Sequence, residues 1–249
     1  MKTVKALIFG VIITNLLIFC AVMQQINRIE NKVDKITKDT LIIKTPVDTA
    51  YKSTYNYILP KIKKFNEKAD TSAIKRIAEV MHFYKLDKNK KRTNLFIGQI
   101  LQESGANQYY YSGHPLEGQL VVSCGGAIGI TQITSYTAFC YMTKIITEKD
   151  KKDMLALGCN DFKFVNKKGT VESKLPKVKE WLKNKDNNIV LWGYIVQDIL
   201  KKVQDINKTL IAYNVGLGGL KTYLDSGCVV SEHEYVININ KKLSRVSAL

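Results

Sequence analysis

Apolar side chains recur at steps of three and four residues along several stretches of this chain, and that spacing restricts its fold more than any other feature. Residues spaced in this way share one face of an α-helix. The longest such face spans about four turns and consists of Ile189, Trp192, Ile195, Ile199 and Val203. No stretch shows the sustained alternation of apolar and polar residues that is typical of a half-buried strand. The sequence therefore predicts a mostly α-helical domain.

Residues whose side-chain oxygen can cap a helix N-terminus stand ahead of the predicted helices. In chain order these candidates are Asp70 or Thr71, Thr93, Asn187 or Asn188, and Ser231, which forms a capping-box pattern with Glu234. The lysine-rich segment 162–171 is interpreted differently. Its Lys167-Lys168-Gly169 sequence is compatible with a small hairpin.

The first 23 residues have the composition of a membrane anchor. Two lysines lie within residues 1–5, and an apolar run continues from 6 to 23. Such a run is at the short end for a spanning helix, and the preceding lysines place the N-terminus inside and the remaining chain outside. Phe19 and Ala21 make a poor signal-peptidase site, since small residues are needed at both positions. We expect a single-pass anchor in the cytoplasmic membrane with the C-terminal domain on the outer, periplasmic or wall-facing side. Secretion after signal cleavage is the alternative.

A short amphipathic stretch follows the predicted anchor. Ile26, Ile29, Val33 and Ile36 fall at alternating steps of three and four, with charged residues between them. This is the spacing of a coiled-coil seam, although about two heptads are marginal alone. We therefore expect residues 24–52 to form a coiled-coil-like stalk and linker, and residues 53–249 to form the domain.

Lysine accounts for nearly all of a formal net charge of +16 at pH 7. Arginine occurs only at positions 28, 76, 92 and 245. Proteins that read nucleic acid usually need the bidentate fork of arginine, whereas dispersed lysine suits a surface near a polyanion such as the cell wall. We expect no nucleic-acid partner. The charge agrees with a wall partner but does not establish one.

The cysteines give no metal or redox motif. No CxxC pair exists, and the three histidines are scattered singly, so we expect no metal site. Four cysteines lie in the body of the chain, namely Cys124, Cys140, Cys159 and Cys228. An even number permits two disulfides in an exported domain, and buried free thiols are the equal alternative.

Glu103 has the most unusual position of the acidic residues. It ends a predicted apolar helix just before Gly105. A carboxylate there meets the negative end of the helix dipole and is partly removed from water by Ile97, Ile100 and Leu101. Both effects raise the pKa, as a general acid for glycosidic cleavage requires. By position alone, a surface glutamate at a frayed helix end is the more common interpretation.

Four short patterns follow one another in the chain, starting at Glu103. They are Glu103-Ser104, then Gly126-Ala127-Ile128-Gly129-Ile130-Thr131-Gln132, then Asn188-Ile189, and then Ala212-Tyr213-Asn214-Val215-Gly216. In this order they resemble the lytic transglycosylases of the soluble (SLT) type, a family of lysozyme-like fold related to the goose-type lysozymes. The helix from Tyr235 toward Ser244 is also like the family's closing helix. The resemblance covers about residues 70–245.

The resemblance implies roles for six residues. Glu103 matches the catalytic acid/base, and Ser104 matches its hydrogen-bonded neighbour. Gly129 and Gln132 match the substrate-groove motif. Tyr213 matches a tyrosine that points at the catalytic carboxyl, and Asn214 matches the asparagine after it. Two segments, 104–125 and 141–187, look longer than the family's pattern, which leaves the subsite specificity open.

The matched patterns supply one carboxylate, whereas most glycosidases use two. Glu117, Asp161 and Glu172 lie outside those patterns. One carboxyl is enough where the substrate provides the nucleophile. The resemblance thus implies cleavage of the β-1,4 bond between N-acetylmuramic acid and N-acetylglucosamine in peptidoglycan, with a 1,6-anhydromuramoyl end and no cofactor.

Two alternatives stay open at this point. A goose-type lysozyme hydrolyses the same bond with water, and a non-catalytic peptidoglycan-binding module retains the groove without the reaction. An anchored enzyme of this class suits local opening of the wall by an envelope-spanning secretion or conjugation machine, or by a phage system.

Overall fold

The computed structural model describes residues 50–110 and 114–247. Residues 49–249 group into one compact unit. The predicted anchor at 1–23, and the stalk and linker up to residue 49, lie outside the described residues. Within the described ranges, no helix combines the length and apolar content needed to cross a membrane.

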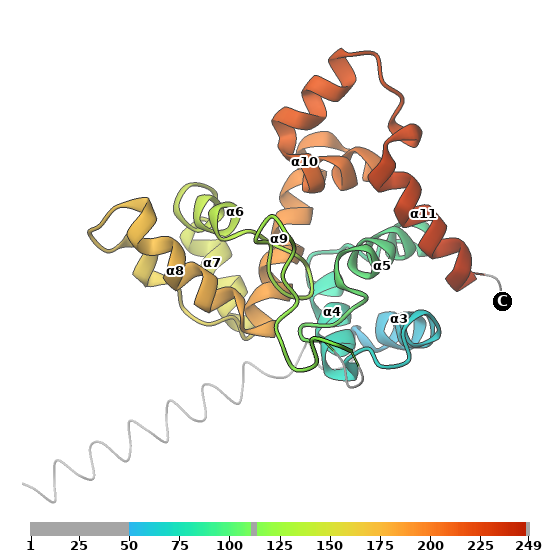
Figure 1. The fold of residues 1–249 in the computed structure, drawn as a ribbon, viewed down its shortest axis with the longest axis horizontal. Coiled ribbons are helices and arrows are strands. Elements are labelled where there is room, and N and C mark those ends of the chain that lie inside the picture. Colours follow the sequence, from blue (N-terminus) through green and yellow to red (C-terminus); the bar gives the residue numbers. More distant parts are fainter. Residues whose placement is uncertain (1–49, 111–113, 248–249) are drawn as a thin grey trace, which may run out of the picture. The chain divides into compact units, whose positions relative to one another are not determined.

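The prediction of a mostly α-helical domain is confirmed (Figure 1). Its elements are α3 (Lys52–Phe65), α4 (Thr71–Phe83), α5 (Lys90–Ser104), α6 (Ser135–Cys140), the π-helical turn η1 (Tyr141–Ile145), α7 (Glu148–Ala156), the 3₁₀ turn η2 (Lys163–Asn166), α8 (Val171–Leu182), α9 (Lys185–Val203), α10 (Ile206–Asp225), the 3₁₀ turn η3 (Val230–Glu232) and α11 (Glu234–Ser247). The long loop between α5 and α6 contains isolated β-bridges, and the described residues contain no strand.

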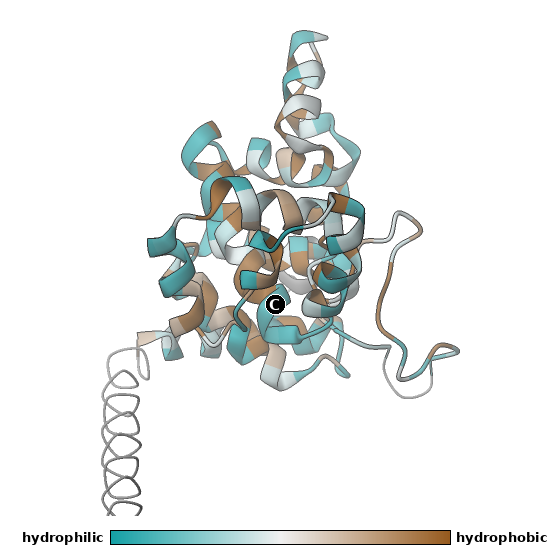
Figure 2. Cartoon of the chain, turned by 90° about the vertical axis from the view of Figure 1, so that its left-hand side faces the viewer, coloured by the Kyte–Doolittle hydropathy of each residue, from teal (hydrophilic) through white to brown (hydrophobic). Residues whose placement is uncertain are grey.

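Helix α9 lies at the centre of the described unit. It contacts α4, α8 and α10, while α11 packs mainly on α5 and also on α3. Figure 1 shows α6, α7 and α8 on one side of α9 and α3, α4, α5 and α11 on the other. Figure 2 shows hydrophobic residues concentrated where the helices face one another and hydrophilic residues on their outward turns.

The apolar face predicted on the strongest helix packs in the core. Trp192 is fully buried, and Ile189, Ile195 and Ile199 are almost completely so. Each such side chain stabilises the fold by about 1.5–3 kcal/mol through removal of its surface from water. The spacing seen in the sequence therefore fixes which face of α9 points inward.

Helix starts agree with the predicted caps in one case and differ in three. Asp70 caps α4, because its Oδ1 accepts from the backbone N–H groups of Ser72 and Ala73. The next helix, α5, begins earlier than predicted and is capped by Asn89, whose side chain accepts from Arg92 N at 2.9 Å. Thr93 lies inside α5, and its hydroxyl donates to the carbonyl of Asn89.

The start of α9 is the second difference. Its cap is Asn184, whose side chain accepts from Asn187 N at 3.1 Å. Asn187 and Asn188 are fully buried in its first turn and bind distant segments instead. The third difference is at α11, because Ser231 lies in η3 and the helix begins at Glu234. The predicted capping box is therefore wrong.

The hairpin considered for residues 162–171 is also wrong. Residues Lys163–Asn166 form the 3₁₀ turn η2, and Val171 begins α8. Phe162 and Val165 are buried, and the Phe162 ring packs edge-on against Trp181 with centroids 5.8 Å apart. Apolar burial of this turn against α8 takes the place of strand pairing.

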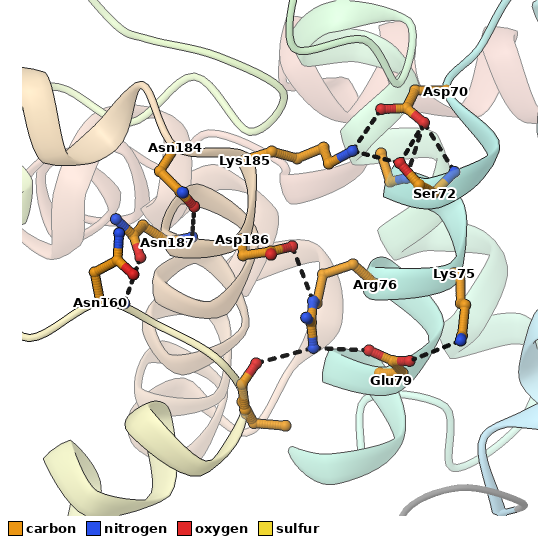
Figure 3. Close-up of polar contacts among 12 residues, drawn as sticks. Asp70, Ser72, Lys75, Arg76, Glu79, Asn160, Asn184, Lys185, Asp186 and Asn187 are labelled. Carbon is orange, nitrogen blue, oxygen red and sulfur yellow. Dashed lines mark hydrogen bonds and ion pairs between the residues drawn. The ribbon is translucent and has the colours of Figure 1, made fainter.

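Ion pairs join α4 to the first turn of α9 (Figure 3). Arg76 donates from Nε to Asp186 at 3.0 Å, and from Nη1 to Glu79 at 2.8 Å and to the Leu157 carbonyl at 2.9 Å. Lys185 pairs with Asp70 at 2.7 Å. Together these contacts fix the register in which α9 lies beside α4.

Candidate active site

Glu103 lies on the last turn of α5, as the sequence predicts. Ser104 is the last residue of the helix, and the C-cap Gly105 has the left-handed backbone conformation (φ 65°) that glycine adopts without strain. The preceding residues Ile97, Ile100 and Leu101 are fully or almost fully buried. Burial raises the pKa of Glu103 to about 7, and a hydrogen bond from Tyr235 partly opposes that rise. A carboxyl with this pKa holds its proton for much of the time near neutral pH.

Tyr235, in the first turn of α11, donates a hydrogen bond to Glu103 Oε1. The close packing of α11 on α5 makes this contact possible. A Cβ on Gly98 would lie 2.8 Å from Ile239 Cγ2 and 2.9 Å from Leu243 Cγ, so the helices approach over a position that only glycine leaves open. Tyr235 is itself buried, and burial together with Glu103 raises its pKa well above the usual value.

Tyr213, on α10, also lies near the carboxyl of Glu103, and both residues line the same cavity. Burial and then the neighbouring charge of Glu103 raise the pKa of its phenol well above the usual value. Its hydroxyl donates to the carbonyl of Thr131 at 2.7 Å. Tyr213 therefore lies beside Glu103 and holds the loop that carries Gln132.

That loop, residues 128–133, contains the second part of the Gly-Ala pattern and is held by side chains of α5, α9, α10 and the loop that follows α5. Ser104 Oγ donates to the Ile130 carbonyl at 2.7 Å, and Gln108 Oε1 accepts from Ile130 N at 2.9 Å. Asn188 Oδ1 accepts from Thr131 N at 3.0 Å and from Thr131 Oγ1 at 2.7 Å. Asn188 Nδ2 donates to the carbonyl of Ile128 at 2.9 Å. These bonds fix the backbone of the loop at Ile128, Ile130 and Thr131.

Gly129 and Gln132 both have positive φ angles, 72° and 52°. A Cβ on Gly129 would lie 2.5 Å from Gln108 Oε1, so a larger residue would be strained in conformation and would displace the Gln108 amide that accepts from Ile130 N. Gln132 Nε2 donates to the carbonyls of Gly129 at 2.7 Å and Val121 at 3.2 Å. These bonds use the donor end of the Gln132 amide and leave Oε1 as an acceptor for a substrate N–H or O–H.

A cavity of about 810 Å³ opens over Glu103. One wall is the loop with Gln132, another is formed by α6 and η1, and α9 and α10 complete it. Helix α10 bends at Gly216 (φ 77°, ψ 164°), and the residues around this bend form part of the lining. A volume of this size accommodates a ligand larger than a single small metabolite.

Four of the six residues assigned from the sequence line this cavity, namely Glu103, Gln132, Tyr213 and Asn214. The other two, Ser104 and Gly129, are not part of its lining and hold the loop beneath it. The sequence patterns therefore separate into residues that face the cavity and residues that position those residues.

Glu103 is the one acidic side chain in the lining among the described residues. Asp161 pairs with Lys151 and Lys163, and Glu172 lies in the first turn of α8, away from the cavity. The cation in the lining is Lys202, which pairs with Asp198 at 2.7 Å. Within the part of the chain that the structure describes, no second carboxylate that could act as nucleophile or base lines this cavity.

The described residues contain no group of three or more His, Cys, Asp and Glu side chains arranged to hold a metal ion. Cys124, Cys140, Cys159 and Cys228 are free thiols. Cys159 is buried, and burial raises the pKa of its thiol far above the usual value. All four cysteines are therefore free, but the alternative of buried free thiols holds for Cys159 alone, because Cys124 and Cys228 are exposed and Cys140 is partly buried.

Sequence reasoning missed three residues of the site: Tyr235, Gln108 and Tyr136, the last an exposed tyrosine on the cavity wall. The sequence predicts Asn188 as a helix cap within a matched pattern, whereas in the structure it binds Thr131 and Ile128 and holds the loop. The signal for Tyr235 was available, because a tyrosine on the apolar face of a helix needs a partner for its hydroxyl. Which partner it finds depends on how α11 packs, and no local pattern contains that information.

Comparison with known proteins identifies no relative: no family model, curated protein or solved structure matches this chain. The assignment of this site therefore rests on its own geometry and on the residue patterns described above.

Proposed function

We propose that this protein is a peptidoglycan lytic transglycosylase with Glu103 as its acid/base. The observation that carries the proposal is a lone, partly buried carboxyl in the lining of a large cavity, with a pKa raised to about 7. A general acid needs a pKa near the working pH, because it must hold a proton and still release it. No second acidic side chain of the described residues lines the cavity, which favours a reaction in which the substrate supplies the nucleophile.

In the proposed reaction, protonated Glu103 donates its proton to the β-1,4 glycosidic oxygen between N-acetylmuramic acid and N-acetylglucosamine. The C1–O bond breaks, and the N-acetylglucosamine end leaves as an alcohol. The 2-acetamido group supports the positive charge that develops at C1. Carboxylate Glu103 then takes the proton of the muramoyl 6-hydroxyl, whose oxygen bonds to C1. This closes a 1,6-anhydro ring, restores the protonated acid and consumes no water.

The cavity offers groups suited to such a substrate. Gln132 presents a carbonyl oxygen to hydroxyl or acetamido N–H groups, and Asn214 offers an amide on the α10 wall. Tyr136 provides an exposed aromatic face, a surface on which sugar rings can pack. The apolar run at 6–23 supports the further proposal that this domain works on the outer face of the cytoplasmic membrane.

Product analysis tests the proposal. The full chain is incubated with purified peptidoglycan, and the released muropeptides are analysed by mass spectrometry. We expect 1,6-anhydromuramoyl ends, which are lighter than hydrolytic ends by one water, and we expect no cleavage by Glu103→Gln.

The other outcomes identify the alternatives. Hydrated reducing ends alone would make the protein a hydrolase of the lysozyme kind. Binding to the wall without any product, from the parent and Glu103→Gln alike, would make it a binding module. Cleavage by Glu103→Gln at the parental rate would remove Glu103 from the site.

A further inference from the structure

A fully buried glutamine lies one helical turn before Glu103 and is not explained by packing alone. Gln99 has no exposed surface, and it belongs to the same face of α5 as Glu103 because the two are four residues apart. Burying an amide without hydrogen bonds costs about 1–3 kcal/mol. An apolar residue at position 99 would avoid that cost, so the amide needs a reason.

Trp192 fixes the orientation of the Gln99 amide. Its indole Nε1–H donates to Gln99 Oε1 at 3.3 Å. The indole nitrogen can only donate, so the oxygen end of the amide must face Trp192. The amino end, Nε2, therefore points the other way and can only act as a donor.

Nε2 is left without an acceptor at normal hydrogen-bond geometry, and it is fully buried. Its neighbour is Tyr235: burial and Glu103 raise the pKa of that phenol, and Gln99 acts in the opposite direction as a hydrogen-bonding group. Tyr235 in turn donates to Glu103 Oε1. The buried side chains of Trp192, Gln99 and Tyr235 thus follow one another toward the carboxyl of Glu103.

We propose that Gln99 is a positioning residue that donates to the hydroxyl oxygen of Tyr235 and thereby sets the direction of a hydrogen-bond chain from Trp192 to Glu103. The chain runs from the indole N–H to Gln99 Oε1, from Gln99 Nε2 to Tyr235 Oη, and from the Tyr235 hydroxyl to Glu103 Oε1. This inference rests on the proposed role of Glu103 as acid/base.

The direction has a chemical consequence. A phenol that accepts from Gln99 must point its own hydrogen at Glu103, so Oε1 is always the acceptor in that pair. The acidic proton of Glu103 is then confined to Oε2, which is the oxygen left to transfer it. Without Gln99 the phenol is free to rotate and to accept the proton of the carboxyl, which takes the acid out of its productive orientation.

Other groups around Glu103 do not supply the same restraint. Tyr213 faces it from α10 but donates to the carbonyl of Thr131. Lys202 lies on the α9 wall of the cavity and is paired with Asp198. Tyr235, from α11, is the hydrogen-bond donor to the carboxyl, and Gln99 is the group placed to orient it.

The test measures the titration of Glu103 directly. The full chain is labelled with glutamate ¹³C-enriched at the side-chain carboxyl, the Glu103 signal is assigned by its loss in Glu103→Gln, and its pKa is read from the NMR titration. In Gln99→Met, which is of similar size but lacks the N–H, the pKa of Glu103 should rise by about 0.5 to 1, because the Tyr235 bond to the carboxylate is weakened. In a Tyr235→Phe background, the same substitution should produce no further rise.

The matched control is Gln197→Met on α9, where the side chain donates to the carbonyl of Tyr84 at 3.1 Å, away from the cavity. It should leave the Glu103 titration unchanged. Equal shifts from Gln99→Met in the two backgrounds, or no shift while Tyr235 is present, would overturn the inference. If Gln99→Met does not fold, Gln99→Asn serves instead, since its shorter amide cannot reach both Trp192 and Tyr235 and should raise the pKa likewise.

The titration needs no substrate, so it separates this inference from the proposed function. A chain that cuts no peptidoglycan but shows the background-dependent shift refutes the function and retains the hydrogen-bond chain. A chain that cuts peptidoglycan but shows no such shift retains the function and refutes the role of Gln99. On the active enzyme, Gln99→Met should also lower the rate on the acidic plateau while moving the loss of activity to higher pH.

Discussion

Tyr235 and Glu103 lie 132 residues apart in the sequence, and in the folded chain the phenolic hydroxyl of the first donates to the carboxylate of the second. The bond joins the closing helix α11 to the last turn of α5. The hydrogen bond lowers the pKa of Glu103 and so partly opposes the effect of burial, which raises that pKa to about 7. The position of α11 therefore sets how easily the acid gives up its proton.

Tyr235→Phe should shift the pH dependence of wall lysis. Loss of the hydrogen bond removes stabilisation of the ionised carboxylate, so the pKa of Glu103 rises further above 7. Activity that requires the protonated acid should then persist to higher pH, while the maximal rate falls about tenfold or more because the acid is no longer oriented. Initial rates of peptidoglycan turbidity loss between pH 5 and about pH 9 measure both effects.

Tyr57→Phe is the matched control for this experiment. Tyr57 lies on α3 and donates to Asn94 Oδ1 at 2.9 Å, at the other end of α5 from Glu103. Its loss should leave the pH profile in place. A Tyr235→Phe profile that coincides with the parent would show that the bond does not tune the acid.

Glu103→Gln should stabilise the fold at the same time as it removes activity. The folded pKa is about 7 and the ordinary value is 4.5, so below pH 4.5 both states hold the proton and the residue costs nothing. Between these values the unfolded chain ionises first, and the free energy of unfolding falls as the pH rises. Above pH 7 the full penalty, roughly 3 kcal/mol, is present.

A neutral glutamine escapes that penalty while still accepting the bond from Tyr235. Urea unfolding at pH 4 should therefore give similar stabilities for parent and variant, and at pH 8 the variant should be the more stable. Glu172→Gln, at an exposed site where backbone and side-chain hydrogen bonds lower the pKa, should show no such gain. A Glu103→Gln chain that is less stable than the parent at pH 8 would contradict the burial of this charge.

Helices α4, α5, α9 and α11 could be predicted from the sequence, because their apolar spacing or capping pattern indicates a helix there. Their starts could not, and Asn188 shows why. Its side chain can cap a helix or bind a distant backbone, and only the fold decides between these uses. Asn188 binds the carbonyl of Ile128, while Asn184 caps α9.

The same reason limits prediction of the site. Glu103, Gln132, Tyr213 and Asn214 stand in recognisable local patterns, and all of them line the cavity. Tyr235 acts on Glu103 only through the packing of two helices that are far apart in sequence. The contact depends on Gly98, because its missing side chain lets α11 pack closely on α5. The sequence alone does not show which helix lies over Gly98.

Gly98→Ala tests the dependence of the acid on that packing. An added methyl group would lie within 3 Å of Ile239 and Leu243, so α11 must move away from α5. Overpacking of this kind costs about 1–3 kcal/mol. We expect a lower melting temperature together with a raised pKa of Glu103, because Tyr235 moves with α11.

Gly218→Ala is a suitable control, since a Cβ there meets no atom within 4 Å. It should leave the titration of Glu103 unchanged. A Gly98→Ala chain with the parental pKa at Glu103 would show that Tyr235 reaches the carboxyl independently of the helix spacing.

Asn188→Ala should loosen the loop that carries Gln132 without touching the acid. The side chain of Asn188 is fully buried, accepts two hydrogen bonds from Thr131 and donates one to Ile128. Its removal leaves the buried partners unpaired, for a destabilisation of about 2–4 kcal/mol. Asn184→Ala, which removes only the exposed cap of α9, should cost about 1 kcal/mol and leave the loop in place.

Removal of the Asn188 side chain should act on substrate binding more than on the chemical step. Because Gln132 lies on the loosened loop and Glu103 on α5, we expect Asn188→Ala to raise KM for peptidoglycan fragments several-fold more than it lowers kcat. Equal effects of the two variants on KM would mean that the loop is held by Ser104, Gln108 and Tyr213 alone.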